Sequence, residues 1–325
     1  MSYHEKLRVG VLRGGPSSEY EVSLKTGAQV LAALAERYHP FDIFIDRAGA
    51  WHMNGVAKEP HLILRYIDVI VNALHGEFGE DGTVQHLLET HRIPFCGSRQ
   101  FGSMLAQNKG LAKNVLAKQG IQTPYFRVIR KEETPDIVSL AAQLYRSFPQ
   151  PSIIKPVAKG SSLGVSLARA PEEIAYALEL AFQGSDAVMV EERIDGSEAV
   201  CAVIEGFRGE REYALLPVQV VLPEGSPFFD YHAKYGKESR HICPGNFAGK
   251  VKKELQTLAS KIHRILELRH YSSCDFIVHP KRGIYFLEAD SLPVLWPDSP
   301  FQVALQSVGS TMPQFLEHII LLAIE

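Results

Sequence analysis

Short apolar runs alternate with amphipathic segments through the first hundred residues of the chain. Residues 7–12 form an apolar run that predicts a buried strand, and Gly14 and Gly15 mark a turn directly after it. The segment that follows has the apolar spacing of a helix, and the sequence Ser18-x-x-Glu21 at its start matches a capping box. A strand, a glycine turn and a helix in this order form a βα unit.

The same alternation continues to about residue 97. Two more buried strands and a helix are expected, at 40–46, 68–74 and 83–90. These elements predict a small doubly wound α/β domain over residues 1–97. The ligand of such a sheet lies beyond the carboxyl ends of its strands, which places it beside the loops at 14–15 and 76–82.

The pattern changes after residue 97. Residues 98–190 are expected to contain helices at 103–118, 139–146 and 171–182, strands at 125–129, 152–155 and 187–192, and one more strand after a loop at 159–164. This order predicts an α+β unit. Residues 191–325 are expected to form a second such unit, with three strand-like runs from 197, a polar loop at 223–246, a helix at 251–269 and a hairpin at 273–290.

Three carboxylates converge in the expected hairpin. If His279 and Ile284 form its last pair, Asp275 is the direct antiparallel partner of Glu288, with their Cβ atoms roughly 4.5–5.5 Å apart. Asp290 follows two residues later and faces the same side. Opposed like charges destabilise a sheet unless a cation neutralises them, and Mg²⁺ or Mn²⁺ binds carboxylate oxygens. The hairpin therefore indicates a metal site, and an exposed acidic sheet face is the alternative.

A phosphate-binding loop is predicted at residues 159–164, where small residues leave backbone N–H groups accessible. Such a loop more often only turns the chain, and this one is not a Walker A sequence. Lys155 lies just upstream, and Lys109 lies in a helix expected to face solvent. Together with the acidic hairpin, these features indicate binding of a nucleoside triphosphate. Glu191 and Glu198 frame a turn where they could hold adenosine or equally lie on the surface.

Two further segments are candidates for the site. His75 ends a buried strand among glycines, which indicates close approach of a ligand, although a lone histidine is more often structural. The loop at 228–235 mixes aromatic and charged residues. It is either a mobile lid over the nucleotide or a surface loop with a packed aromatic anchor.

Composition excludes several classes of partner. The 325 residues include 34 Lys and Arg against 37 Asp and Glu, a formal charge of −3 with no basic cluster. This argues against nucleic acid or an anionic membrane as the main partner. No stretch reaches the roughly 18 apolar residues of a membrane span, and the charged amino terminus does not fit a signal peptide, so a cytoplasmic protein is expected. Four scattered cysteines without a CxxC pair indicate neither a zinc site nor a disulfide framework.

Taken together, these residues resemble the D-alanine–D-alanine ligase family of the ATP-grasp superfamily over nearly the whole chain. The matching positions are Gly14, Gly15, Ser17, Glu19 and 21–24; 75–82 with Gln85, Leu88 and Glu89; Lys155 and Pro156; 160–162 and Gly164; Tyr231 and 233–235; Cys243 and Pro244; and Asp275 with 288–290. The resemblance implies an ATP-grasp fold of two α+β subdomains behind the N-terminal domain. It also implies a homodimer.

The implied reaction joins two D-alanines for peptidoglycan precursor synthesis. ATP would phosphorylate the carboxylate of the first D-alanine, and the amine of the second would attack the acyl phosphate. The implied roles are Glu19, Ser161 and Tyr235 around the first amino group, with His75 counted in the catalytic set; Lys109, Lys155 and Lys234 on phosphates; Glu191, Ile194 and Glu198 on adenosine; and Asp275, Glu288 and Asp290 on Mg²⁺ or Mn²⁺.

The departures from the family pattern lie on the substrate side. Ser273 stands in place of an arginine, Val294 in place of a glycine, and Asp290 in place of an asparagine, while Trp296 adds bulk near the expected second-substrate pocket. These departures leave open a ligase of the same fold with a different acceptor. A nucleotide-binding pseudoenzyme is a third reading, against which stand the retained catalytic residues Glu19, Ser161, Lys234 and Tyr235.

Overall fold

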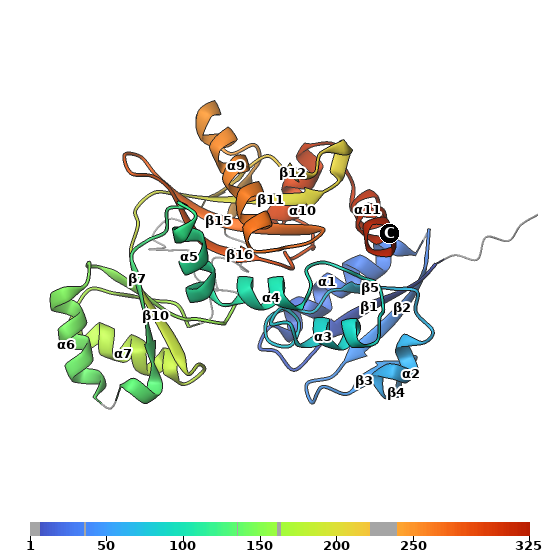
Figure 1. The fold of residues 1–325 in the computed structure, drawn as a ribbon, viewed down its shortest axis with the longest axis horizontal. Coiled ribbons are helices and arrows are strands. Elements are labelled where there is room, and N and C mark those ends of the chain that lie inside the picture. Colours follow the sequence, from blue (N-terminus) through green and yellow to red (C-terminus); the bar gives the residue numbers. More distant parts are fainter. Residues whose placement is uncertain (1–6, 36, 135, 161–163, 222–238) are drawn as a thin grey trace, which may run out of the picture.

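The structure is a computed structural model that describes residues 7–35, 37–134, 136–160, 164–221 and 239–325, and its strands form three sheets (Figure 1). The N-terminal sheet has the spatial order β4 (Val56–Ala57), β3 (Trp51–Met53), β2 (His39–Ile45), β1 (Arg8–Gly14), β5 (Val69–Asn72) and β6 (Phe95–Cys96). The last four of these strands pair in parallel, which confirms the expected doubly wound core. The short strands β3 and β4 add an antiparallel edge that was not expected.

Helices cover both faces of this sheet. One face packs against α1 (Tyr20–Leu34) and the C-terminal helix α11 (Met312–Ile324), and the other against α2 (Pro60–Leu64) and α3 (Thr83–Thr90). The alternation of β1 explains this, because Val9 and Val11 point to the first face and Leu12 to the second. The last helix thus brings the end of the chain back to its first domain (Figure 1).

The start of α1 differs from the expected capping box. The residue that precedes α1 is Glu19, which makes no side-chain cap, and its own N–H donates to Ser17 Oγ at 2.9 Å. Ser18 Oγ instead donates weakly to Glu77, and Glu21 accepts from Arg47 at 3.3 Å. The capping-box prediction is therefore wrong, because the serine turn before the helix directs the Glu19 carboxylate into the protein interior.

The central sheet is wholly antiparallel. Its order is β7 (Phe126–Arg130), β10 (Ala187–Glu192), β8 (Ser152–Pro156) and β9 (Ser166–Ala168), with α6 (Ile137–Ser147) and α7 (Pro171–Phe182) packed on it and a 3₁₀ turn, η1 (Lys131–Glu133), after β7. This arrangement confirms the α+β prediction.

The helix expected at 103–118 is divided in two. α4 (Gln100–Gln107) ends at Asn108, whose side chain accepts a hydrogen bond from the N–H of Leu111 at 3.0 Å and so begins α5 (Lys109–Lys118). α5 is not solvent-facing as expected, because its buried side packs on the C-terminal sheet beside β16.

The C-terminal sheet follows the order β14 (Arg240–Ile242), β13 (Val218–Val221), β11 (Ser197–Glu205), β15 (Tyr271–His279) and β16 (Gly283–Asp290), with β12 (Glu212–Ala214) also paired to β11 and a 3₁₀ turn, η2 (Phe207–Gly209), between those two. One face packs on α4, α5 and α9 (Gly249–Ile265), and the other on α10 (Pro300–Ser307) and α11. α9 ends four residues before the expected 269, and Glu267 beyond it has left-handed backbone (φ 53°).

The four cysteines are all free thiols, as expected. Within the described ranges, no helix combines the length and apolar content needed to cross a bilayer.

Candidate active site

A cavity of about 490 Å³ lies between the central and C-terminal sheets. Its walls come from strands β8, β10, β11, β13, β15 and β16. The residues named from the sequence that line it are Lys109, Lys155, Glu191, Ile194, Glu198, Asp275 and Glu288. Candidate residues for binding phosphate, adenosine and a metal ion therefore line the same cavity.

The hairpin of β15 and β16 places two of the acidic residues opposite each other. Asp275 pairs with Glu288, as expected. The last pair, however, is His279 with Gly283 rather than Ile284, and a bulge beside Asp275 restores the register. Asp290 lies two residues after Glu288 on β16 and pairs with Ser273. It therefore faces the same side of the sheet as Glu288.

Lys109 is buried at the first residue of α5, contrary to the solvated position expected. Its Nζ lies 3.2 Å from Glu288 Oε2 and donates to the carbonyl oxygen of Lys159 at 2.5 Å. The ammonium group therefore joins the acidic hairpin to the start of the predicted phosphate loop.

Glu191 is buried between two lysines. Lys155 Nζ lies 2.5 Å from Glu191 Oε2, and Lys113 forms an ion pair with Glu191 Oε1. Burial opposes the charge of Glu191, but the two ammonium groups outweigh it and hold its pKa below the usual value. Burial likewise opposes the charge of Lys155, but Glu191 and Glu288 outweigh it and raise the pKa of that lysine.

Lys113 was not identified from the sequence. It is fully buried, and burial outweighs its attraction to Glu191 and lowers its pKa to about 8. Its spacing of four residues from Lys109 on one helix face was the available signal. The sequence did not reveal that this face would be buried.

Glu19 occupies the N-terminal side of the site, with only 5% of its surface exposed. It lies between two glycines from distant loops. A Cβ atom on Gly160 would stand 2.5 Å from Glu19 Oε1, and one on Gly76 would stand 3.0 Å from it. The predicted phosphate loop and the switch-point loop therefore meet at this carboxylate.

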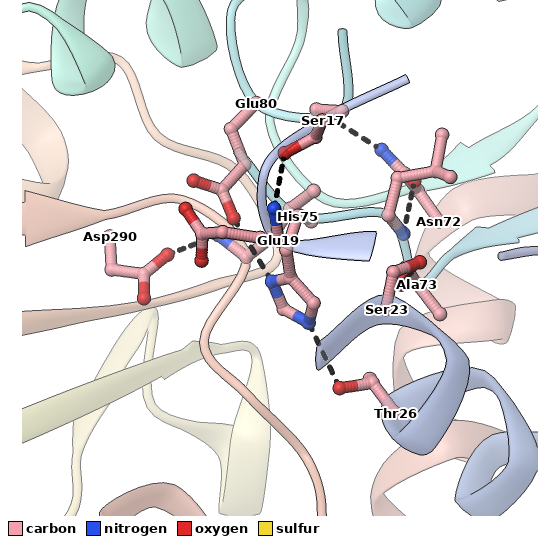
Figure 2. A network of polar contacts seen from close by, with 12 residues as sticks. Ser17, Glu19, Ser23, Thr26, Asn72, Ala73, His75, Glu80 and Asp290 are labelled. Carbon is pink, nitrogen blue, oxygen red and sulfur yellow. Dashed lines mark hydrogen bonds and ion pairs between the residues drawn. The ribbon is translucent and has the colours of Figure 1, made fainter. Parts of the chain in front are cut away.

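His75 holds the switch-point loop through both ring nitrogens (Figure 2). Nδ1 lies 3.0 Å from Glu80 Oε1, and Nε2 lies 2.9 Å from Thr26 Oγ1. The imidazole is buried, with 2% of the residue exposed. These contacts suit a positioning role for His75, since both nitrogens are engaged by side chains of the N-terminal domain.

Three candidate residues, Ser161, Lys234 and Tyr235, lie outside the described residues, as does the whole of the predicted lid loop at 228–235.

A metal ion could draw on the three carboxylates of the hairpin. Asp275 and Glu288 line the large cavity, and Asp275 and Asp290 line a smaller one beside it. Hard oxygen donors on one face of a sheet suit Mg²⁺ in ligand type. Among the described residues, no group of three or more His, Cys, Asp or Glu side chains is placed so that it could hold a metal ion. The hairpin therefore offers carboxylate oxygens of a suitable chemical type, but they are not gathered into a complete metal site.

The smaller cavity has a volume of about 50 Å³. Its lining includes all four departures from the family pattern, Ser273, Asp290, Val294 and Trp296, together with His241, which was not singled out from the sequence. Lys25 from the N-terminal domain lies 5.9 Å from the centre of the Trp296 ring. The departures therefore gather at one place, next to the carboxylates.

Comparisons with known proteins agree along the chain. A family model described as "D-ala D-ala ligase C-terminus" matches residues 115–321, and one described as "D-ala D-ala ligase N-terminus" matches residues 8–64 and 56–98. The D-alanine–D-alanine ligase of Geobacter sulfurreducens is 36% identical over 97% of this chain and 94% of its own length. That of Syntrophobacter fumaroxidans is 34% identical over 99% of both.

Comparison with solved structures agrees with these sequence matches. The D-alanine–D-alanine ligase of Coxiella burnetii superposes with a TM-score of 0.83 at 25% identity, covering 98% of this chain and 94% of its own. The VanG D-Ala:D-Ser ligase of Enterococcus faecalis also gives 0.83, at 26% identity, covering 98% of this chain and all of its own.

Proposed function

Because this chain belongs to the D-alanine–D-alanine ligase family and is an ATP-dependent ligase with the ATP-grasp fold, we propose that it joins two D-alanines to supply peptidoglycan precursors. The observation that carries the proposal is the shared cavity, where the opposed Asp275 and Glu288 meet Lys109 and the buried pair of Lys155 and Glu191. To transfer a phosphoryl group, a protein must position the phosphates and neutralise their charge. Positive and acidic groups side by side can do both.

The reaction divides into two steps. The carboxylate of the first D-alanine attacks the γ-phosphorus of ATP, forming an acyl phosphate and ADP. The neutral amino nitrogen of the second D-alanine then attacks the acyl carbon. The bond to the phosphate oxygen breaks, inorganic phosphate leaves with that electron pair, and the nitrogen releases its extra proton to the departing phosphate or to solvent. Catalysis consists mainly of positioning the reactants and neutralising their charge.

Each group of residues has a task in this scheme. Glu19 binds the ammonium group of the first D-alanine, with Ser161 and Tyr235, and His75 fixes the loop beside it. Lys109, Lys155 and Lys234 hold phosphate oxygens. Glu191, Ile194 and Glu198 hold adenosine, for which their place on the cavity wall is the support.

Asp275, Glu288 and Asp290 would hold Mg²⁺ or Mn²⁺ together with the phosphates. When bound, the cation supplies positive charge to the transferring phosphoryl group. Lys109 acts beside this set, since its ammonium already contacts Glu288.

The relatives do not favour the alternatives of a different acceptor or a pseudoenzyme, since the curated relatives named above carry the name D-alanine–D-alanine ligase. We further infer a functional division into residues 1–97 on the substrate side, 98–190 with the phosphate loop and 191–325 with the metal site and lid. The existence of a separate sheet in each part supports it. A homodimer in the cytoplasm, with no nucleic acid or membrane partner, completes the proposal.

The test is incubation of the purified protein with D-alanine, ATP and MgCl₂, followed by phosphate release and product mass. We expect D-alanyl-D-alanine with one phosphate released per dipeptide. Turnover that requires a different amino acid as acceptor, in a panel of D- and L-amino acids and D-hydroxy acids, would overturn the assignment. So would ATP-dependent thermal stabilisation without any product.

A further inference from the structure

We propose that His241 binds the acceptor substrate, with its Nε2 atom accepting a hydrogen bond from the amino group of the second D-alanine. This inference rests on the proposed function, since it assigns a residue to the second half of that reaction. It starts from the small cavity of about 50 Å³, where His241 of β14 meets Ser273, Asp290 and Trp296.

The tautomer of His241 follows from one contact. Its Nδ1 lies 2.6 Å from the backbone carbonyl oxygen of Asp298. A carbonyl oxygen can only accept a hydrogen bond, so Nδ1 carries the proton and donates. Burial lowers the pKa of His241, which outweighs the attraction of the Asp298 carbonyl and favours the neutral ring. Nε2 is therefore a lone-pair acceptor.

The Nε2 atom is buried and has no hydrogen-bond partner among the described residues. A buried nitrogen without a partner is unfavourable, so a ligand group that satisfies it would be stabilised there. The other polar side chains that line the cavity among the described residues are those of Ser273, Asp275, Asp290, Trp296 and Ser299. The two carboxylates belong to the proposed metal set, so His241 Nε2 is the acceptor in this lining that the set does not use, and it matches a ligand with an N–H donor.

An amino group is such a ligand. The second D-alanine must present its nitrogen close to the acyl carbon, and the cavity shares Asp275 with the larger chamber where the phosphates are proposed to lie. Once the ammonium group of the second D-alanine has given up one proton to solvent, a hydrogen bond from a remaining N–H to Nε2 leaves the nitrogen lone pair free to attack. In the family pattern an arginine at the position of Ser273 would contribute charge here, and His241 provides orientation in a pocket without it.

Two substitutions separate binding from a purely structural role. His241→Asn retains a donor near the position of Nδ1, so it keeps the bond to Asp298 but loses the Nε2 acceptor. His241→Gln places an acceptor oxygen near the position of Nε2 but loses that bond. If His241 only anchors the turn at Asp298, the asparagine variant should be the more active. If it binds the acceptor, the glutamine variant should be the more active.

The assay is initial velocity against D-alanine concentration, analysed for two KM values, with melting temperature as the check on folding. In parallel, hydroxylamine traps the acyl phosphate and reports the first step alone. We expect H241N to raise the KM for the second D-alanine about tenfold with unchanged hydroxamate formation, and H241Q to stay within about threefold of wild type.

An unchanged second KM in H241N, or a larger loss in H241Q than in H241N, would overturn the inference. A wild-type protein that forms hydroxamate but no dipeptide would instead overturn the proposed function, and this inference with it. The wild-type and variant results therefore distinguish the two failures.

Discussion

Lys113 and Glu191 form an ion pair in which both side chains are buried, and Lys113 is not among the residues that line the large cavity, whereas Glu191 is. Glu191 also pairs with Lys155, which does line that cavity. The three groups together carry one net positive charge. Without Lys113, the pair of Glu191 and Lys155 would carry no net charge, so we infer that Lys113 preserves the positive charge with which Lys155 is proposed to attract phosphate.

We therefore predict that Lys113→Met weakens ATP binding by about tenfold or more. Removing one charge-assisted hydrogen bond from a buried network should also lower the free energy of unfolding by about 2 kcal/mol. Equilibrium binding of ATP without D-alanine measures the first effect, and urea denaturation the second. The matched control is Lys118→Met, since Lys118 is exposed at the end of the same helix.

A double substitution tests the charge argument itself. Lys113→Met with Glu191→Gln leaves Lys155 as the sole charge and restores the net value of one. We expect this pair to bind ATP more tightly than Lys113→Met alone. Glu191→Gln alone measures the loss of the adenosine contact proposed for Glu191. If, after that loss is taken into account, the pair binds ATP no more tightly than Lys113→Met, the electrostatic role is contradicted and Lys113 is a packing residue.

ATP binding should also depend on pH through Lys113. Burial lowers its pKa to about 8, whereas the pKa of Lys155 is raised and that of Glu191 lowered, so both of these stay charged near that pH. As the pH rises through about 8, Lys113 loses its proton, the net charge of the cluster falls from one to zero, and the affinity for ATP should fall. Lys113→Arg remains charged, so its profile should lack this step. A step that persists in Lys113→Arg would assign the titration to another group.

The acidic hairpin gives a third prediction. Glu288→Gln removes a carboxylate that faces Asp275 and contacts Lys109, so turnover should fall at least about a hundredfold at saturating ATP. The control is Glu192→Gln, because Glu192 also lines the cavity but forms an ion pair with Arg282 at its edge. Phosphate release measures both. Activity within threefold of wild type in Glu288→Gln would remove Glu288 from the proposed metal set.

The pairing of Asp275 with Glu288 could be predicted because strand alternation and a short turn fix the register closely. The turn itself is one residue tighter than strand alternation predicts, and a bulge beside Asp275 compensates for the difference. A bulge follows from how the sheet bends around a site, and the alternation of residues does not reveal it. The three sheets could be predicted for the same reason. The alternation of apolar residues that identifies each strand is a local feature of the sequence.

Residues whose environment depends on contacts between distant segments were missed. Lys113 looks like an ordinary surface lysine until α5 is known to dock on β16. The role proposed for His241 depends on its contact with the carbonyl of Asp298, which lies 57 positions further along the chain. The capping box at Ser18 failed similarly, because local propensity yielded to the burial of Glu19.

His75 should behave as a positioning residue. His75→Ala removes the buried partner of Glu80 Oε1 and Thr26 Oγ1 and should lower the free energy of unfolding by about 1–3 kcal/mol. The switch-point loop would then hold Glu19 less firmly, so we expect a higher KM for the first D-alanine with little change in ATP affinity. His91→Ala, at an exposed histidine, is the control. A lost kcat with unchanged KM and stability would instead indicate direct participation in the chemistry.

Gly160→Ala tests whether the phosphate loop and Glu19 work as one site. A Cβ atom at Gly160 would stand 2.5 Å from Glu19 Oε1, closer than atoms tolerate, so either the loop or the carboxylate must move. Because Glu19 is proposed to hold the first amino group, the KM for the first D-alanine should rise about tenfold. Gly249→Ala, where an added Cβ meets nothing within 4 Å, should leave both steps unchanged. If Gly160→Ala instead leaves the KM for D-alanine unchanged, Glu19 does not hold the first substrate where this loop approaches it.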